Sequence, residues 1–367
     1  MASTILYNDF VHDGLPGRVV FGCGVARKRL RAELEAVGAR RALLVVARAE
    51  RALAEELVGG LDDVVVGVFD EVRPHVPVEI ARRATEAARE RRADWVLSVG
   101  GGSTTGTAKA VALKLGLPVA AVPTTYAGSE MTPVWGLTED GRKVTGRAAA
   151  VLPRLVVYDP ELTISLPARI TAASAGNGLA HCVEAFYAPA SSPIAVLLAE
   201  EGIRALVAGA PRAVAAPEDL EARSETLYGA YLAGAAFALA GSDLHHKICH
   251  VLGGALDLPH AETHALVLPH AIALVEPALA DRAQHRLRSA LGSPDETAAD
   301  ALYDFLGQFD LPRSLHELGL PAADIPPLAD EILSQIPAST PRRPTANDIR
   351  GLLERARNGE PPLAEEE

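Results

Sequence analysis

The sequence predicts an α/β N-terminal domain built on a parallel sheet, followed by an all-helical C-terminal domain. The first half of the chain alternates short β-branched runs with segments of helical periodicity, which is the pattern of βαβ units. A run of three glycines directly follows one of the predicted strands. From about residue 162 onward the chain is rich in Ala, Leu, Glu and Arg and has almost no β-branched run.

The predicted strands are short apolar runs of the kind that a parallel sheet buries on both faces. They cover Arg41–Ala47, Asp63–Phe69, Asp94–Val99 and Leu117–Val122. Helical periodicity separates them, over Lys28–Val37, Ala49–Val58 and Pro77–Arg91. Because strands and helices alternate, we expect the strands to run parallel with helices on both faces of the sheet.

The domain boundary is predicted from length and from one proline. A chain of 367 residues is too long for one comfortable core and predicts two domains. We place the boundary near the Asp159-Pro160 step, because proline disfavours helix in the residue before it. The α/β domain is therefore expected over residues 1–160 and the helical domain over residues 161–367.

The composition excludes several classes of function. The 35 basic and 47 acidic side chains give a net charge of −12 at pH 7, which argues against a surface for nucleic acid or anionic membrane. An anionic ligand must then be held by a local cluster of donors. The three cysteines are too scattered for a disulfide framework, and neither a signal-peptide pattern nor a membrane-spanning apolar run is present. We expect a cytoplasmic enzyme with reduced thiols.

The glycine run is the first motif with chemical consequences. Residues Ser98–Lys109 read SVGGGSTTGTAK. Consecutive glycines allow positive φ and let another group approach the backbone, and the amides at the start of the following helix attract phosphate. The motif is neither the GxGxxG fingerprint nor a Walker loop. We expect this loop to bind the phosphates of a nucleotide and the first domain to bind a dinucleotide.

A second polar loop, Pro123–Thr132, follows the last of the four predicted strands and reads PTTYAGSEMT. Ligands of open parallel sheets bind at the carboxyl ends of strands, so the two loops together are expected to line one crevice. The hydroxyls of Thr124, Thr125 and Ser129 are the candidate ligand contacts, although a simple capping loop would have a similar composition.

The most specific motif is a cluster of histidines between Leu244 and His270, a segment that holds six of the 11 in the chain. Its members are His245, His246, His250, His260, His264 and His270. His246 and His250 share one helix face, and a Gly-Gly pair at 253–254 is expected to return His260 to the same region. One buried histidine is ordinary core, whereas six together indicate metal binding, oxyanion stabilisation or proton transfer.

Asn177 and His181 form a further pair, four residues apart on a predicted helix. A carboxylate at position 177 would complete, with three histidines, an oxygen–nitrogen ligand set for a divalent transition metal. The asparagine that stands there carries no charge and is a poor ligand. The histidine pocket is therefore predicted, while the case for a metal in it is weakened.

Together these stretches resemble the iron-containing alcohol dehydrogenase family, and within it the maleylacetate reductases. The resemblance runs along nearly the whole chain. The motifs that carry it are VFGCG at 20–24, GGGS at 100–103, PTT at 123–125, GSE at 128–130, DPELT at 159–163, GNGLAH at 176–181, HHKICHVLGGALDLPHAETHALVLPH at 245–270 and TPRRPTANDIRGLLERA at 340–356. The histidine-rich segment is distinctive of the reductases.

The resemblance implies a dehydroquinate synthase-like, iron-containing alcohol dehydrogenase fold, a homodimer, and catalysis in a cleft between the domains. It implies that two sets of residues hold NADH or NADPH. The first set holds the pyrophosphate and the second contacts the phosphate and nicotinamide side: Gly100, Gly101, Gly102 and Ser103; Thr124, Thr125 and Ser129.

The resemblance also identifies the positions at which the family holds its metal, and they are Asn177, His181, His246 and His260. This chain departs from the metal-dependent members at Asn177, and again at Gly106, where those members usually carry aspartate. The maleylacetate reductases share the departure at Asn177 and are thought not to need metal. We therefore expect that metal is not required here.

The reaction implied is the reduction of the carbon–carbon double bond of maleylacetate to 3-oxoadipate in the degradation of aromatic compounds. Hydride would go to the alkene carbon β to the ketone, and hydrogen-bond donors would stabilise the enolate oxygen while an acid protonates the α-carbon. His246 and His250 are the candidates for these two roles. Their neighbours His245 and Lys247 are counted with the site.

The two substrate carboxylates need cations. Besides Lys247, the candidates are Arg142, Lys143 and Arg147, on what is expected to be a basic loop before the domain boundary. A solvated loop with no role explains these three residues equally well.

The residues that follow one predicted strand bear on the choice between NADH and NADPH. The predicted strand at 41–47 is followed by Arg48, with no acid before Glu50 to repel a 2′-phosphate, so NADPH is expected to be accepted beside NADH. Two other functions remain open. One is a metal-dependent alcohol dehydrogenase or carbonyl reductase of the same family, and the other is a non-catalytic nucleotide-binding relative.

Overall fold

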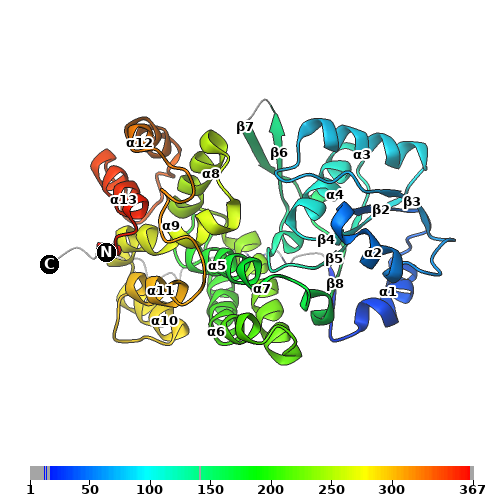
Figure 1. Ribbon diagram of the computed structural model, residues 1–367, viewed down its shortest axis with the longest axis horizontal. Helices are drawn as coiled ribbons and strands as arrows, with labels where there is room; N and C mark the ends of the chain where they lie inside the picture. The colour runs from blue at the N-terminus through cyan, green and yellow to red at the C-terminus, as the bar shows by residue number, and fades with distance from the viewer. Residues whose placement is uncertain (1–11, 13, 15–16, 140–141, 364–367) are drawn as a thin grey trace. The chain divides into compact units, whose positions relative to one another are not determined.

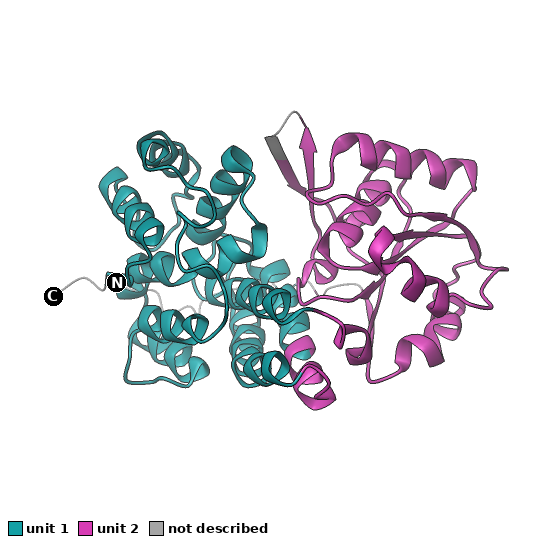
Figure 2. Cartoon of the chain, viewed as in Figure 1, with its two compact units in different colours: residues 1–13, 167–216, 228–367 teal, residues 14–166, 217–227 magenta. Residues whose placement is uncertain are grey.

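In the computed structural model, residues 12, 14, 17–139 and 142–363 are described. The chain divides into two compact units (Figure 2). The first contains the sheet and takes the described residues of 14–166 and 217–227, and the second contains helices and takes those of 167–216 and 228–367. Residues 217–227 thus group with the sheet, although the sequence analysis assigns them to the helical domain. The domain ranges themselves stay predictions.

The sheet unit is built on six parallel strands in the order β1-β8-β5-β4-β2-β3 (Figure 1). The strands are β1 (Arg18–Phe21), β2 (Ala42–Val46), β3 (Val65–Phe69), β4 (Trp95–Gly100), β5 (Val119–Pro123) and β8 (Leu155–Tyr158). β2, β4, β5 and β8 are buried on both faces. The predicted α/β fold class is confirmed, and the four predicted strands correspond to β2, β3, β4 and β5 with ends shifted by one or two residues.

Helices cover both faces of this sheet, as expected from βαβ units. One face packs against α1 (Val25–Ala36) and α2 (Arg51–Leu57), which follows a short 3-10 turn at Arg48–Glu50. The other face packs against α3 (Val78–Glu90) and α4 (Gly102–Leu115). The glycine run therefore joins a central strand to a helix that is packed on the sheet.

The prediction of a basic loop before the domain boundary is wrong. Arg142–Arg147 forms strand β7, which pairs antiparallel with β6 (Val134–Glu139) in a separate two-stranded sheet. The register places Gly146 opposite Trp135. A Cβ atom at Gly146 would lie 2.4 Å from Cζ2 of the Trp135 ring, so the ring covers this glycine and favours the hairpin over a solvated loop.

The second unit is helical, as predicted. Its helices are α5 (Ala168–Glu184), α6 (Pro193–Ala215), the later part of α7 (Leu220–Ala240), α8 (Leu244–Leu256), α9 (His260–Val275), α10 (Asp281–Leu291), α11 (Ala298–Gly307), α12 (Ile325–Gln335) and α13 (Ala346–Asn358). One apolar core joins them. None of the described helices has the length and apolarity needed to cross a membrane.

Helix α5 runs through the middle of this core, and every residue from Thr171 to Glu184 is buried. Small residues permit this close packing. A Cβ atom at Gly176 would lie 2.7 Å from the Cβ atom of Ala265 on α9. The buried α5 carries three polar side chains that matter for the site, Asn177, His181 and Glu184.

Asp159 joins strand β8 to the turn between β1 and helix α1. It follows β8 and is fully buried, and its carboxylate accepts hydrogen bonds from the backbone amides of Gly24 (2.9 Å), Ala26 (3.0 Å) and Glu161 (3.1 Å). Gly24 adopts φ 72 and has no side chain of its own to cap α1. The carboxylate therefore supplies the cap that a neighbouring side chain would normally provide.

Replacing Asp159 with alanine should lower the free energy of unfolding by about 2–4 kcal/mol, because three amides lose their acceptor in a buried place. Urea unfolding followed by circular dichroism measures this change. Glu35→Ala is the control, since its ion pair with Arg31 is exposed and its removal should cost less than about 0.5 kcal/mol. Equal stability of Asp159→Ala and the control would contradict the capping role.

Candidate active site

The glycine turn between β4 and α4 leaves no room for side chains. Gly100 adopts φ +147, and a Cβ atom there would lie 2.6 Å from Oγ1 of Thr104 and 2.7 Å from Oε2 of Glu50. A Cβ atom at Gly101 would lie 2.9 Å from Cγ2 of Thr125. The second polar loop follows β5, and β5 pairs with β4 so that Pro123 lies opposite Gly100. The two loops thus lie side by side at the carboxyl ends of two neighbouring strands, as the sequence predicts.

Lys109 holds the second loop in place, a role that sequence reasoning missed. Its ammonium group is buried and lies within hydrogen-bond distance of four oxygen atoms. These are the carbonyl oxygens of Ser129 (2.6 Å), Thr132 (2.8 Å) and Val134 (2.8 Å) and the hydroxyl of Thr132 (2.9 Å). Burial lowers the pKa of Lys109 to about 7, while the four oxygens favour its charged form. The sequence signal that could have identified Lys109 was its position at the end of the glycine motif Ser98–Lys109.

Glu50 is a second residue whose position only the structure reveals. Its carboxylate accepts a hydrogen bond from the hydroxyl of Thr124 and from the backbone amide of Gly101. Burial raises the pKa of Glu50. An acid therefore lies against the loop that was assigned to phosphate, while Arg48, two residues earlier, is exposed.

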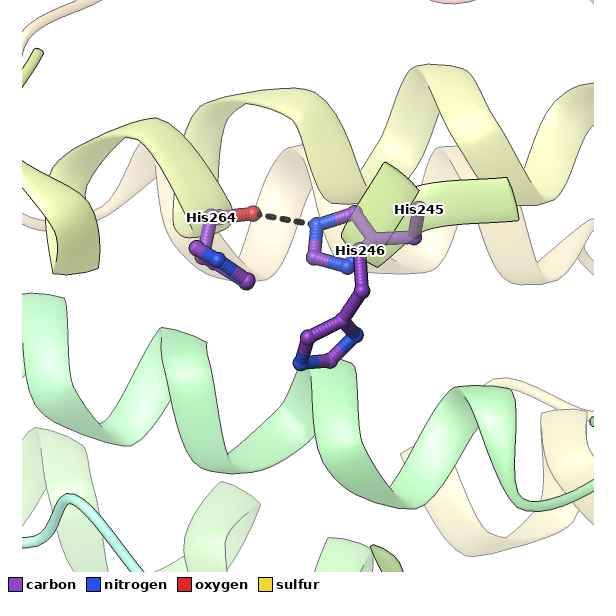
Figure 3. Close-up of side chains that lie close together, drawn as sticks. All are labelled: His245, His246 and His264. Carbon is purple, nitrogen blue, oxygen red and sulfur yellow. Dashed lines mark hydrogen bonds between the residues drawn. The ribbon is translucent and has the colours of Figure 1, made fainter. Parts of the chain in front are cut away.

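In the helical unit, three histidines bring their rings together at the start of α8 and on α9. They are His245, His246 and His264 (Figure 3), which are all buried and offer ligand nitrogens within 4.8 Å of one another. The ring of His246 lies 4.7 Å from that of His264 and 5.8 Å from that of His250, measured between centroids. The predicted clustering of these residues is thus observed.

Glu184 orients His246. One carboxylate oxygen accepts from Nδ1 of His246, and the other accepts from the backbone amides of Asp243 and His246, both at 3.1 Å. The sequence analysis missed Glu184, although it stands three residues after His181 on the same face of α5. Burial raises the pKa of Glu184, so one proton is shared across a short contact between two buried groups.

Three neighbouring imidazoles, those of His181, His245 and His264, are held neutral. Burial, assisted by the neighbouring imidazoles, lowers the pKa of His181 and of His264 well below 6.5. Burial also lowers the pKa of His245, and Nε2 of this ring lies 3.0 Å from the carbonyl oxygen of His264. At neutral pH these rings are therefore neutral ligands or hydrogen-bond donors.

The turn that brings α9 back to α8 lies later than predicted. Gly253 and Gly254 are inside α8, and the reversal occurs at Asp257–Pro259. Asp257 adopts φ 54, a left-handed conformation that aspartate tolerates better than most residues. Pro259 then restricts the residue before it to extended backbone.

The other predicted site residues have less buried positions. His250 and Lys247 are half-buried on α8, and His260 is exposed at the first residue of α9. Ser103, Thr125 and Ser129 are half-buried in the sheet unit, whereas Thr124 is buried. The cofactor candidates and the histidines thus belong to different units.

Comparisons with known proteins identify the family. The family described as "Iron-containing alcohol dehydrogenase" matches residues 16–160, and "Fe-containing alcohol dehydrogenase family, C-terminal" matches residues 171–357. This chain belongs to the iron-containing alcohol dehydrogenase family. The resemblance stated from the sequence is thereby confirmed.

Individual relatives are similar along almost their whole length. A maleylacetate reductase of Burkholderia cepacia is 47% identical over 96% of this chain and 99% of its own length. One of Sphingobium indicum is 48% identical over 96% and 99%. The crystal structure of the maleylacetate reductase from Agrobacterium tumefaciens has a TM-score of 0.91 and 43% identity, and the match covers 97% of this chain and 100% of that one.

The family's metal positions do not converge into a ligand set among the described residues. Asn177 offers a neutral amide in place of a carboxylate, and the exposed His260 is outside the group of converging histidines. The rings of His181 and His246 are nearly parallel, at 16° and 5.2 Å between centroids. These four residues therefore do not fit the family's iron as a site.

Substituting Gly101 with valine should weaken binding of the dinucleotide that the sequence predicts for this loop at least about tenfold, or about 1.4 kcal/mol. The new side chain would collide with Thr125 and separate the two loops. Quenching of protein fluorescence by NADH measures the affinity. Gly351→Ala on α13 is the control, because a Cβ atom there meets no described atom within 4 Å. Unchanged affinity in Gly101→Val would remove this loop from the cofactor site.

Proposed function

We propose that this chain reduces the carbon–carbon double bond of maleylacetate with NADH or NADPH and releases 3-oxoadipate, as a step in the breakdown of aromatic compounds. The observation that carries the proposal is the identity of 47–48% with two maleylacetate reductases over 96% of the chain. The buried histidine cluster supports it, because it supplies the donors that this reduction needs.

The reduction moves one hydride and one proton. Hydride leaves the dihydronicotinamide ring and bonds to the alkene carbon β to the ketone. The π electrons move toward the carbonyl, so negative charge develops on an enolate oxygen. A proton then bonds to the α-carbon, the enolate returns to a ketone, and the oxidised dinucleotide leaves.

His246 and His250 are proposed to stabilise the enolate oxygen and to deliver the proton. When the proton shared by Glu184 and His246 resides on Glu184, Nε2 of His246 carries a hydrogen and can donate. His250 is half-buried and its ring lies 5.8 Å from that of His246, so both can face one substrate. Lys247, between them in sequence, is proposed to bind a substrate carboxylate, and His245 to support the ring of His246.

The glycine loop, Thr124, Thr125 and Ser129 are proposed to hold the cofactor. Arg48 is exposed just beyond the end of β2, where it can approach a 2′-phosphate. Glu50 turns toward Thr124 and Gly101 instead. We therefore propose that NADPH is accepted beside NADH, with a preference for NADH no greater than roughly a hundredfold, or about 2.7 kcal/mol.

We propose that the protein is a homodimer and that it works in the cytoplasm. The cysteines of the described part, Cys23, Cys182 and Cys249, are all free thiols, which suits a reducing compartment. Light scattering coupled to size exclusion tests the dimer.

A single assay tests the activity. Maleylacetate is formed in situ from hydroxyquinol by a dioxygenase, and oxidation of NADH or NADPH is followed by absorbance while 3-oxoadipate is identified by mass spectrometry. Consumption of both cofactors with this product is the expected result. Turnover of simple aldehydes or ketones but not of maleylacetate would assign the chain to the carbonyl reductases of the family.

The variants His246→Ala and His250→Ala should each lower kcat roughly 10²–10³-fold while the protein stays folded, since each removes one preorganised donor or acid. Steady-state kinetics with maleylacetate measures the loss, and thermal unfolding checks the fold. His285→Ala, at an exposed histidine of α10, should keep full activity. Near-normal turnover in both cluster variants would exclude these residues from the mechanism.

Exhaustive chelation should leave full activity. A divalent ion on the family's positions would face an amide and neutral imidazoles, without the carboxylate that otherwise offsets its charge, so binding there should be weak. Activity and elemental content are measured before and after treatment with EDTA. About one tightly held metal per chain, with activity lost on its removal and restored on its return, would overturn metal independence.

A further inference from the structure

We propose that His245, His246 and His264 form a binding site for Zn²⁺ that is distinct from the metal positions of the family. It shares only His246 with those positions and leaves out Asn177, His181 and His260. The existence of the zinc site does not depend on the proposed function. The effect of bound zinc on turnover rests on the proposed function, because zinc would occupy His246, which the reaction is proposed to use.

Three buried ring nitrogens of His245 and His264 support this site. His245 donates from Nε2 to the carbonyl oxygen of His264, so its Nδ1 carries the lone pair. Within the described part of the chain, neither this Nδ1 nor either ring nitrogen of His264 has a hydrogen-bond partner, and both side chains are fully buried. A buried polar atom without a partner costs about 1–3 kcal/mol. A metal ion at this place would satisfy one such nitrogen from each ring.

The hydrogen bonds of His245 and His246 also orient their rings for a metal ion. Glu184 accepts from Nδ1 of His246, which leaves Nε2 as the atom that can ligate. A ligating histidine that donates its other nitrogen to a carboxylate or a backbone carbonyl is the usual arrangement at zinc sites. His245 has the carbonyl, as Figure 3 shows, and His246 has the carboxylate of Glu184, so two of the three rings are already oriented in this way.

The carboxylates near the three imidazoles favour a cation. Three neutral imidazoles bring no negative charge to a divalent cation, but Glu184 lies directly behind His246, and Asp243 stands three residues before it in sequence. Glu184 is fully buried, and it accepts from the amide of Asp243, whose own side chain is also buried. These carboxylates offset the charge of the ion without ligating it. Binding at Nε2 of His246 displaces any proton held by that atom to solvent, while the proton between Nδ1 and Glu184 stays in place.

The type of ligand and the route from the surface to the site both indicate zinc. Three histidine nitrogens with a fourth position left for water or another ligand are a known zinc arrangement, whereas magnesium and calcium prefer oxygen. The exposed ring of His260 lies 4.1 Å from that of the buried His264. A chain of imidazoles therefore leads from the surface to the site.

The test titrates ZnCl₂ into chelated full-length protein and follows heat by calorimetry, with Co²⁺ absorption as a second readout. The wild type should bind one ion per chain. His264→Leu and His245→Phe replace partly unpartnered buried rings by apolar side chains that can stay folded, and each should weaken binding at least about 100-fold. Glu184→Gln should weaken it about 10–100-fold, through loss of the oriented and negative partner.

Two controls locate the ion. His270→Leu removes another buried histidine of α9, outside the group of three, and His260→Ala removes a family position. Both should bind Zn²⁺ within about threefold of the wild type. Loss of binding in His260→Ala or His181→Leu with normal binding in His264→Leu would overturn the proposal in favour of the family positions. Absence of stoichiometric binding in the folded wild type would overturn it outright.

Turnover separates this proposal from the proposed function. If His246 acts on the substrate, bound Zn²⁺ should abolish NADH oxidation with maleylacetate, and EDTA should restore it. Zinc bound through the three histidines without inhibition would support the site and contradict the role of His246 in the reaction. Inhibition that persists in His264→Leu would contradict the site, because the ion would then act elsewhere.

Discussion

The helical unit depends on one buried carboxylate, that of Glu184. It lies at the end of α5 and accepts three hydrogen bonds from the segment that opens α8, two from the amides of Asp243 and His246 and one from the ring of His246. The first amides of a helix have no partner within it. Glu184 from another helix and the N-cap residue Asp243, whose carboxylate accepts from the amide of Leu244, together fix where α8 begins. The same contact fixes the orientation of His246, which joins helix packing to site chemistry.

The sheet unit uses acids and a lysine in the same way at its loops. Asp159 caps α1 from the neighbouring strand β8, Glu50 binds Thr124 and Gly101, and Lys109 binds the carbonyl oxygens of the second loop. Asp159 and Lys109 are buried and Glu50 is half-buried, and each of them is hydrogen-bonded, as buried polar groups must be. The loops at the sheet edge are thus held by side chains from other elements, which is a rigid base for a cofactor.

Neutral imidazoles give the histidine cluster two kinds of chemistry. Burial keeps His181, His245 and His264 uncharged, and an uncharged ring can either donate to a developing oxyanion or ligate a metal. The family's iron requires a carboxylate that Asn177 does not supply. The chain therefore keeps histidines at the family's metal positions and carries a neutral amide at position 177.

The sequence by itself determined the parallel sheet, the helical second half, the glycine loop and the histidine cluster, because periodicity and short motifs are local properties. It also placed Asn177 and His181 on one helix. Tertiary structure alone decided the roles of Glu184, Glu50 and Lys109, since each acts on a residue far away in sequence or on another element. It also showed that Arg142–Arg147 forms a strand, because pairing with β6 and the Trp135 ring above Gly146 stabilise that hairpin. Finally, it showed that His264 joins His245 and His246 while His260 stays exposed, because the turn at Asp257–Pro259 sets the rotation of α9 against α8.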